Sequence, residues 1–397
     1  MEQKKKILLV TPMLDQGGLE RVCVRTARLL QKDFDVTIAV FDGREILYDV
    51  TGLSVVDLQL PSRPGKLGKL LNIFFRSHKL RKLKKKLGID LSYGFGPTAS
   101  ISNSFRRGKD VIFSGLRSYL DLGDHRRLQW YARHSDCLVC CSARIAEEAA
   151  KLLPGKRIEV LYNPYNMEEI QEKAAESEPQ LPWNVKEGEE DTGHTPLLAS
   201  MGRENDVKGF WHLIKAVAEL KRRGIPVRLM IIGEGTFEPY RQLAGQLGIG
   251  ENVFFTGVQK NPYPYLKQAD LYVLSSVNEG FPNALVEAMS LALPVIAANC
   301  PSGPAEILME NYQEKKLQGY SRETYGILLP ELGRERNLDP QVLEPEEKIL
   351  ADAVQLLLQD QECYAYYTGQ AAKRAAYFSD QAYLQKLTKM MQESYKL

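Results

Sequence analysis

Short uninterrupted apolar runs alternate with longer helical patterns along almost the whole chain. In the first half, the runs that predict strands cover residues 7–10, 36–40, 90–93, 111–113, 137–141 and 158–161. In the second half, they cover residues 197–201, 227–232, 253–256, 271–274, 294–297 and 326–328. The stretches between them, such as 19–30 and 210–222, carry apolar residues at helical spacing. This alternation predicts an α/β protein with parallel sheets covered on both faces.

The number of strands predicts two domains. Six strands suffice for one doubly wound sheet, and 397 residues are enough for two. The segment 176–196 is rich in proline, glycine and acidic residues, and it predicts a linker or surface loop. The polar segment 310–345 predicts an excursion whose role the sequence leaves open. Ligands of doubly wound sheets bind beyond the carboxyl ends of the strands, so we expect the chemistry in the loops that follow them.

Composition adds few constraints. The formal net charge is +2, which gives no reason to expect a nucleic-acid partner. Cys137 and Cys140 lie three residues apart on a predicted strand, so their thiols face opposite sides and a metal or redox role is disfavoured. The first apolar run, residues 7–10, is too short for a signal peptide or a membrane span. We therefore expect a cytoplasmic protein.

The first motif with chemical potential follows the first strand. Gly17 and Gly18 precede a predicted helix, where backbone amides and the helix dipole suit an anion. An ordinary strand-to-helix turn explains the same two residues. The full Gly-x-Gly-x-x-Gly spacing of a dinucleotide site is missing, which argues against a dehydrogenase.

The second motif places Arg203 and Lys208 at the two ends of a short loop, before a glycine that begins a helix. A guanidinium can grip two phosphate oxygens, and an ammonium adds a mobile point charge, so the pair suits a diphosphate. The alternative is two solvated loop cations.

The third motif covers residues 278–288. Gly280 permits a tight turn and Pro282 suits a first helical turn, which leaves the amides of 281–284 available to a ligand. Glu287 interrupts an otherwise apolar helix, where a carboxylate needs partners such as the two hydroxyls of a ribose. Glu279, just before the helix, could reach a sugar. The alternative is a pair of ordinary surface glutamates.

Together these residues resemble glycosyltransferase family 4, a large retaining family of the GT-B type. The resemblance rests on the Glu279-x7-Glu287 pair, on Arg203 with Lys208, and on the glycine loop near the amino end. Smaller matches lie at 161–164, 233–235, 255–257 and 302–306. It implies two doubly wound, Rossmann-like domains that face each other across a cleft. The acceptor-side domain covers 1–170 and is rejoined by the C-terminal helix 380–397, and the donor domain covers 190–379.

The resemblance also assigns roles to residues. Arg203 and Lys208 hold the donor diphosphate, Glu279 orients the donor sugar, and these three are the expected catalytic residues. The residues expected to bind the donor are Gly17, Gly18, Val258, Gly280, Phe281, Pro282, Asn283, Ala284 and Glu287. Among them, Glu287 binds the ribose and Val258 lies near the base. No metal or cofactor is expected, because the cations neutralise the phosphates.

The implied activity is retaining transfer of a hexose or N-acetylhexosamine from a nucleotide diphosphate sugar to a glycan or lipid-linked acceptor in cell-surface polysaccharide synthesis. A UDP-sugar is favoured by the resemblance, whereas the sugar, the acceptor and the oligomeric state are not determined. Two alternatives are a non-catalytic nucleotide-sugar-binding protein and a nucleotide-sugar epimerase of GT-B fold. Loss of Arg203, Lys208 or Glu279 would favour the first, and all three are present.

Two features of the first half leave alternatives open. Many relatives have a histidine where this chain reads Arg117, which either contacts the acceptor or pairs within its domain. The segment 71–87 combines many cations with Phe75, Leu80, Leu83 and Leu87 at near-helical spacing. It suits peripheral docking on the anionic inner face of a membrane, and a solvated basic helix face explains it equally well.

Overall fold

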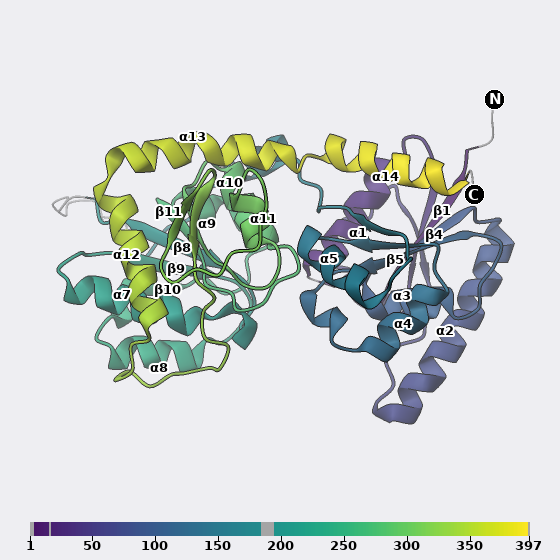
Figure 1. The fold of residues 1–397 in the computed structure, drawn as a ribbon, viewed down its shortest axis with the longest axis horizontal. Coiled ribbons are helices and arrows are strands. Elements are labelled where there is room, and N and C mark those ends of the chain that lie inside the picture. The colour runs from purple at the N-terminus through teal and green to yellow at the C-terminus, as the bar shows by residue number, and fades with distance from the viewer. Residues whose placement is uncertain (1–3, 16, 184–193, 396–397) are drawn as a thin grey trace. The chain divides into compact units, whose positions relative to one another are not determined.

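The computed structural model describes residues 4–15, 17–183 and 194–395, and its contacts divide the chain into two compact units. The first unit comprises Met1–Pro164 and Phe378–Leu397, and the second comprises Tyr165–Tyr377. Each unit contains one seven-stranded sheet covered by helices (Figure 1). The prediction of two doubly wound α/β domains is therefore confirmed.

All the strands of the first sheet are parallel, in the order β3-β2-β1-β4-β5-β6-β7. The strands are β1 (Lys6–Thr11), β2 (Asp35–Val40), β3 (Ser54–Asp57), β4 (Leu91–Gly94), β5 (Val111–Leu116), β6 (Cys137–Cys140) and β7 (Ile158–Val160). The helices are α1 (Gly18–Leu30), α2 (Gly65–Leu87), α3 (Gly96–Ser104), the 3-10 turn η1 (Tyr119–Leu122), α4 (His125–Arg133), α5 (Ala143–Leu152) and α14 (Asp380–Tyr395).

The second sheet has the order β10-β9-β8-β11-β12-β14-β13, and only β13 runs antiparallel to its neighbour. The strands are β8 (Leu197–Met201), β9 (Arg228–Ile232), β10 (Val253–Phe255), β11 (Leu271–Leu274), β12 (Val295–Ala298), β13 (Ser321–Glu323) and β14 (Gly326–Leu329). The helices are α6 (Met167–Ala174), η2 (Asp206–Lys208), α7 (Phe210–Arg222), α8 (Glu238–Gln246), η3 (Gly250–Asn252), α9 (Tyr263–Lys267), α10 (Asn283–Ser290), α11 (Pro304–Leu308), α12 (Pro345–Gln359) and α13 (Gln361–Tyr377).

Every strand predicted from an apolar run is present, and each sheet has one additional strand at its edge. The two additional strands, β3 and β13, are short and largely half-buried or exposed. An edge strand pairs on one side only and meets solvent, so its sequence lacks the apolar run that marks a buried strand. The expectation of six strands in each sheet was therefore wrong, because each sheet has one more strand at its edge.

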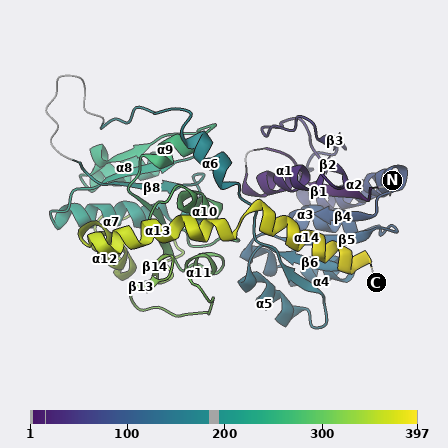
Figure 2. The same ribbon diagram turned by 90° about the horizontal axis from the view of Figure 1, so that it is seen from above.

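The division between the units differs from the expected domain ends at 170 and 190. The structure assigns residues from Tyr165 onward to the second unit, because α6 packs against α9 and α10. The hydroxyl of Tyr165 donates to the side-chain oxygen of Asn283, and Gln171 donates to the carbonyl of Ser290 at 3.2 Å. Part of the expected linker, 184–193, lies outside the described residues. In the same unit, α13 runs beside α10 (Figure 2).

In the first unit, alternate residues of β1 enter two different cores. Ile7 and Leu9 join the cluster that α1 and α14 cover, whereas Leu8 and Val10 join the cluster that α2 and α3 cover. Successive side chains of a strand point to opposite faces, so one apolar strand supplies both cores. Helix α14 is fastened to α1 by a hydrogen bond between the hydroxyls of Tyr383 and Thr26 at 2.7 Å.

Helix α2 covers the sheet with two of the apolar residues named in the basic segment 71–87. Leu80 is 1% exposed and Leu83 packs against the same core, so these leucines cover the sheet and do not face solvent. Lys84 is also buried, and its Nζ lies 2.8 Å from a carboxylate oxygen of Asp110. Leu80 and Leu83 therefore belong to the core and play no part in the membrane-docking alternative, because a helix lying on a sheet must first cover that sheet.

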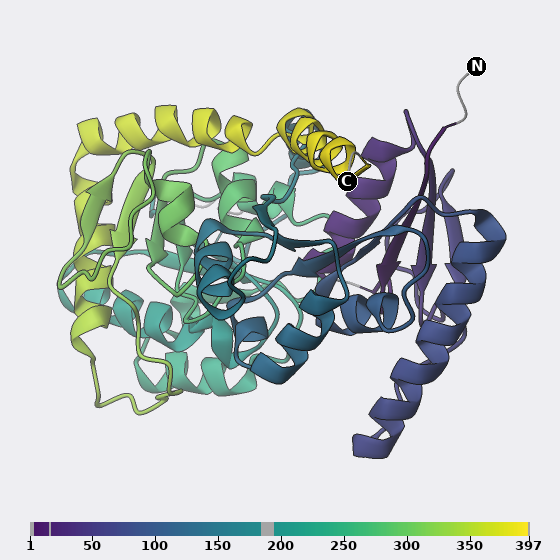
Figure 3. The same cartoon turned by 45° about the vertical axis from the view of Figure 1, so that its right-hand side comes forward.

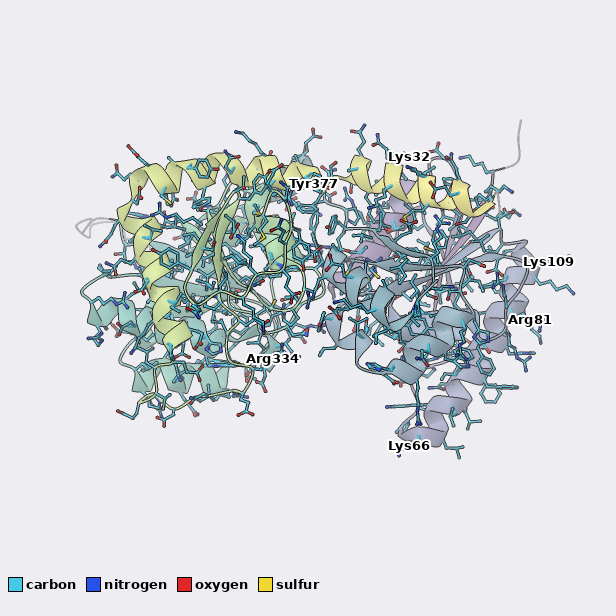
Figure 4. The ribbon with its side chains drawn as sticks, viewed as in Figure 1. Lys32, Lys66, Arg81, Lys109, Arg334 and Tyr377 are labelled. Carbon is cyan, nitrogen blue, oxygen red and sulfur yellow. The ribbon has the colours of Figure 1, made fainter. Side chains whose placement is uncertain are left out.

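The exposed apolar residues of α2 lie in its amino-terminal half, which projects beyond the sheet (Figure 3). They are Leu67, Leu70, Leu71, Phe74 and Phe75. Figure 4 shows Lys66 near the projecting end of this helix and Arg81 in its other half. Among the residues that the structure describes, the helices are all too short or too polar to cross a membrane.

Candidate active site

The topology of the second sheet singles out one position for a ligand. The chain passes from the central strand β8 to β9 and β10 on one side and then returns to β11 on the other. The loops after β8 and β11 therefore lead away in opposite directions, and ligands of doubly wound sheets bind at such a switch point. Lys208 follows β8 and Glu279 follows β11, so the two predicted residues reach the switch point from different strands.

The structure brings these two side chains into contact. Lys208 Nζ donates to Glu279 Oε1 at 2.7 Å, and the hydroxyl of Ser276 donates to the same oxygen at 2.8 Å. The side chains of Lys208 and Glu279 are 23% and 12% exposed, so the ion pair is shielded from solvent yet open on one side. Ser276 was not predicted from the sequence. Its position directly after an apolar strand, in a loop predicted to bind a ligand, is the signal that could have identified it.

Backbone contacts hold the two loops together. The Val277 amide donates to the Val207 carbonyl at 2.9 Å, and the Ser275 hydroxyl donates to the Lys208 carbonyl at 3.0 Å. Gly209 has φ +58°, and a Cβ at this position would lie 2.2 Å from the Ser275 carbonyl oxygen. Only glycine permits this approach, so the residue after Lys208 fixes how closely the loops meet.

The turn before α10 is clamped by the loop after β12. The Ser302 hydroxyl donates to the Gly280 carbonyl at 2.6 Å. Gly303 has φ +98°, and a Cβ there would lie 2.4 Å from the Cδ of Pro282. Phe281 is 5% exposed within this turn. The motif at 302–306, which the sequence analysis left without a role, therefore supports the predicted donor loop.

Helix α10 buries the carboxylate of Glu287. Its side chain is 2% exposed, and its neighbours Val286 and Ala288 are fully buried. The alternative of an ordinary surface glutamate is therefore wrong. Burial of a carboxylate costs free energy, because the group loses its hydration and needs polar partners in the protein or in a ligand. At the start of the same helix, Asn283 accepts the hydrogen bond from Tyr165, and Ala284 follows in the first turn.

The loops after β9 and β10 complete the same edge of the sheet. A Cβ at Gly233 would lie 2.0 Å from the Gly202 carbonyl oxygen, and the Gly233 amide donates to the Gly257 carbonyl at 3.3 Å. Val258 is 53% exposed beside this contact. Arg203 follows Gly202 and is exposed, and within the described part of the chain its guanidinium makes no hydrogen bond or ion pair.

Cys300, in the loop after β12, is buried near the ion pair, and this burial raises the pKa of its thiol far above the usual range. A thiol that stays protonated is a poor nucleophile. Covalent chemistry through Cys300 is therefore disfavoured.

The glycine loop of the first unit is already engaged. The Gly17 amide donates to the Tyr48 hydroxyl at 3.1 Å, and that hydroxyl donates to the Gly17 carbonyl at 2.6 Å. Gly18 is the first residue of α1. The sequence analysis did not find Tyr48, which lies far from the loop along the chain and carries no motif.

Arg117 pairs within its own unit. Its guanidinium donates to the Asn163 side chain at 2.9 Å and to the Tyr93 hydroxyl at 2.7 Å. It also lies 4.9 Å from the centre of the Phe95 ring. Burial raises the pKa of Tyr93, so this hydroxyl stays protonated beside the cation. Arg117 therefore pairs within its own unit, as one of the two alternatives expected, and its contact with an acceptor stays a prediction.

One group of side chains in the described residues has the composition of a metal site: His212, Glu344 and Glu347. However, His212 Nδ1 lies 2.8 Å from Glu347 Oε1, a hydrogen-bond distance. Two ligands at about 2.0–2.1 Å from one tetrahedral ion would be farther apart. The Lys215 ammonium also lies 3.8 Å from this oxygen and would repel a cation. The group therefore fits a shared proton better than a metal.

Comparison with known proteins identifies the family. The model described as Glycosyltransferase Family 4 matches residues 16–169, and the model described as Glycosyl transferases group 1 matches residues 184–323. The chain is a GT-B glycosyltransferase of the family 4 type. The two family models match residues in both units of this glycosyltransferase, and the predicted family is confirmed.

Individual relatives agree with this assignment. The glycosyltransferase is 25% identical over 312 residues to the N-acetylgalactosamine-N,N'-diacetylbacillosaminyl-diphospho-undecaprenol 4-alpha-N-acetylgalactosaminyltransferase of Campylobacter jejuni, covering 74% of this chain and 80% of that protein. It is 28% identical to the lipopolysaccharide core biosynthesis glycosyltransferase LpsE of Rhizobium meliloti, covering 71% and 75%. An uncharacterized glycosyltransferase of Methanocaldococcus jannaschii is 35% identical, but the match spans 43% of this chain and only 44% of that protein.

Solved structures show the same fold. HepE of Anabaena in complex with UDP superimposes with a TM-score of 0.72 at 17% identity, covering 98% of this chain and all of HepE. The sucrose-phosphate synthase of Thermosynechococcus elongatus has a TM-score of 0.74 at 16% identity, covering 99% of this chain and 100% of that one.

Proposed function

We propose that this glycosyltransferase moves a hexose or N-acetylhexosamine, with retention of configuration, from a UDP-sugar to a glycan or lipid-linked acceptor of a cell-surface polysaccharide or lipopolysaccharide. The observation that carries the proposal is the Lys208–Glu279 ion pair, which joins the loops after β8 and β11 at the switch point of the second sheet. The relatives named for lipopolysaccharide core synthesis and for an undecaprenol-linked substrate support this acceptor class. The UDP complex of HepE supports the nucleotide.

Lys208 and Arg203 are proposed to bind the diphosphate. When the bond between the sugar and its phosphate oxygen breaks, the bonding electrons leave with the oxygen, and negative charge grows on UDP. A fixed ammonium beside that oxygen stabilises the transition state more than the ground state. Arg203 adds a guanidinium that can grip two oxygens at once. Two cations could neutralise the leaving group without a divalent metal ion.

Glu279 is proposed to orient the donor sugar. A carboxylate only accepts hydrogen bonds, so it suits the hydroxyls of a hexose. One of its oxygens is already held by Lys208 and Ser276, which fixes the direction of the other. The contact also places the cation proposed to bind the diphosphate next to the carboxylate proposed to bind the sugar. In a nucleotide sugar the diphosphate and the sugar are neighbours in the same order. The turn at 280–282 then supplies backbone amides beside the sugar.

Glu287 and Val258 are proposed to bind the nucleoside. The Glu287 carboxylate is 2% exposed and lies on the helix that follows the sugar-binding turn. A carboxylate there can accept hydrogen bonds from both hydroxyls of a ribose diol. Val258, at 53% exposure, offers an apolar surface for one face of the base.

A panel of nucleotides and nucleotide sugars tests the donor assignment. A ligand at a hundredfold excess over its dissociation constant stabilises the protein by about 2.7 kcal/mol, which a thermal-unfolding assay resolves. UDP and one UDP-sugar should raise the melting temperature, and ADP and GDP should not. Product analysis by NMR then decides between the alternatives. A glycoside with the donor's anomeric configuration supports retention, inversion would refute it, and an epimerised donor would point to the epimerase.

We also propose that the acceptor is reached at an anionic membrane surface, through the projecting end of α2. This end exposes Leu67 and Leu70 at 72% and 64%, together with the rings of Phe74 and Phe75. Apolar side chains among lysines and arginines suit the boundary between lipid headgroups and acyl chains, where the rings enter the lipid and the cations meet phosphate. The lysines farther along the helix add long-range attraction.

A further inference from the structure

The segment between β14 and α12 packs against the proposed sugar-binding loop. Leu332 is 4% exposed and forms a small apolar cluster with Val277 and Ala298. Val277 precedes Glu279 by two residues, and Ala298 ends β12. Whatever holds Leu332 in place therefore supports the loop that carries Glu279.

Gly333, the next residue, is held by a buried histidine. His212 Nε2 lies 2.9 Å from the Gly333 carbonyl oxygen, and His212 Nδ1 lies 2.8 Å from Glu347 Oε1. A carbonyl oxygen can only accept, so Nε2 must carry a hydrogen. The second contact contains one proton, on the ring or on the carboxylate, and it is a hydrogen bond in either case. The imidazole is therefore fixed at both ends.

The surroundings keep this contact dry and oriented. The side chains of His212 and Glu347 are both 0% exposed. The other oxygen of Glu347 accepts the Glu344 amide at 2.8 Å, within the capping box that begins α12. Lys215 Nζ, on the same helix as His212, lies 3.8 Å from Glu347 Oε1 and is itself buried. Buried polar contacts of this kind are specific in geometry, because an unmatched partner is costly.

His212 is also connected to the loop that carries Lys208. It lies in the first turn of α7, and its amide donates to the carbonyl of Gly209, which follows Lys208 directly. The side chain thus connects the loop that carries Lys208 with the segment that supports Glu279. Neither glutamate of the group touches the ion pair itself.

We propose that His212 is a positioning residue for sugar transfer. By holding Gly333, it keeps Leu332 against Val277 and so keeps Glu279 in register with Lys208. The inference rests on the proposed function for its catalytic consequence, whereas the physical link between His212 and Val277 does not depend on that function.

Two substitutions separate the two ends of the ring. His212→Gln places an amide NH2 near the position of Nε2 and keeps the bond to Gly333, but it loses Glu347. His212→Asn places its amide near Nδ1 and keeps Glu347, but it loses Gly333. Both variants should lower the melting temperature, because each leaves one buried partner unmatched. A residue that serves only the core would give the two variants similar effects on catalysis.

The proposal predicts a difference between them. His212→Asn should lower kcat about tenfold, which is the effect of losing one hydrogen bond between uncharged groups. The affinity for UDP should stay unchanged. His212→Gln should restore most of kcat. Hydrogen exchange of the Val277 amide, which donates to Val207, should speed up in the Asn variant and not in the Gln variant.

Equal loss of kcat in the two variants, or unchanged exchange at Val277 in His212→Asn, would overturn the proposal. The exchange measurement uses the protein without any substrate, so it decides the link even for a chain that transfers no sugar. Absence of UDP binding and transfer in the wild type would instead refute the proposed function.

Discussion

The two sheets have the same strand order around their central strands, yet the carboxyl ends of those strands carry different chemistry. At the β8/β11 switch point, a lysine and a glutamate from different loops form a partly shielded ion pair. At the β1/β4 switch point, the Gly17 amide donates to the Tyr48 hydroxyl, and Arg117, which follows the neighbouring strand β5, donates to Tyr93 and Asn163. One edge presents an ion pair between two loops, whereas the polar groups named at the other edge pair with uncharged partners of the same unit.

Strand order determines where a binding site lies in each unit, and the side chains at that place determine what it can bind. A doubly wound sheet offers a switch point in either unit. The second unit is proposed to bind a charged donor there, which fixed charges of both signs suit. The first unit instead holds its cation, Arg117, in hydrogen bonds to Tyr93 and Asn163.

The largest effect is expected at Lys208. Lys208→Ala removes the cation that faces the growing charge of the leaving group, so kcat should fall about 100-fold or more. Steady-state kinetics with the preferred UDP-sugar measures this, and Lys221→Ala, an exposed lysine at the other end of α7, is the matched control. A kcat within about threefold of the wild type would remove Lys208 from the catalytic step.

Lipid binding should depend on the projecting end of α2. Leu67→Ser with Leu70→Ser should weaken cosedimentation with anionic vesicles more than about tenfold, since each leucine forfeits its transfer from water. Leu47→Ser with Leu120→Ser, which are 64% and 65% exposed elsewhere in the same unit, is the matched control.

The lysine-rich half of the same helix should contribute electrostatically. Lys82→Glu with Lys85→Glu and Lys86→Glu should weaken binding at low salt and lose its effect as the Debye length falls below about 8 Å. Lys84 is left unchanged, because its buried ion pair with Asp110 would make any loss ambiguous. Vesicle binding that survives both sets of substitutions would show that the exposed face of α2 is not the lipid-binding surface.

Glu287→Gln should act on binding and spare the chemical step. It keeps the size of the side chain and removes the charge that accepts from the ribose, so KM for the donor should rise about tenfold with little change in kcat. The ribose lies away from the breaking bond, which is the reason for the contrast with Lys208. A larger kcat loss in Glu287→Gln than in Lys208→Ala would reverse the proposed division of the donor site.

A smaller effect is expected in the first unit. Tyr48→Phe removes the hydroxyl that both donates to and accepts from Gly17, and one lost hydrogen bond corresponds to about threefold to tenfold. The change should appear in KM for the donor, because Gly17 and Gly18 are expected to bind it, and should leave the acceptor KM unaltered. If the acceptor KM rises instead, the glycine loop belongs to the acceptor site and its expected role is wrong.

No effect is expected from chelation. EDTA should leave the transfer rate unchanged, because Arg203 and Lys208 are proposed to neutralise the diphosphate and the His212 group fits a proton. The same assay with added Mg²⁺ or Mn²⁺ completes the test. Abolition by EDTA, with recovery on adding a divalent ion, would place a metal in the donor site.

Several features of the molecule were accessible from the sequence alone. Apolar runs located every buried strand, because a strand covered on both faces is built mostly of apolar residues. Glu287 was recognised as unusual for the same reason, since a carboxylate inside an apolar helix contradicts the local pattern. Lys208 and Glu279 were each placed after the correct strand. These inferences use neighbours along the chain, which the sequence contains directly.

The tertiary structure decided what depends on distant partners. Lys84 and Lys82 look alike in a basic run, but only Lys84 meets Asp110 in the interior. Leu80 and Leu70 are both leucines of one helix, yet the sheet ends between them, so one is buried and the other exposed. The contacts of Ser276 with Glu279, Tyr48 with Gly17 and His212 with Gly333 follow from strand order and loop approach. Local periodicity carries no record of these distances, since they are set only when separate strands become neighbours in a sheet.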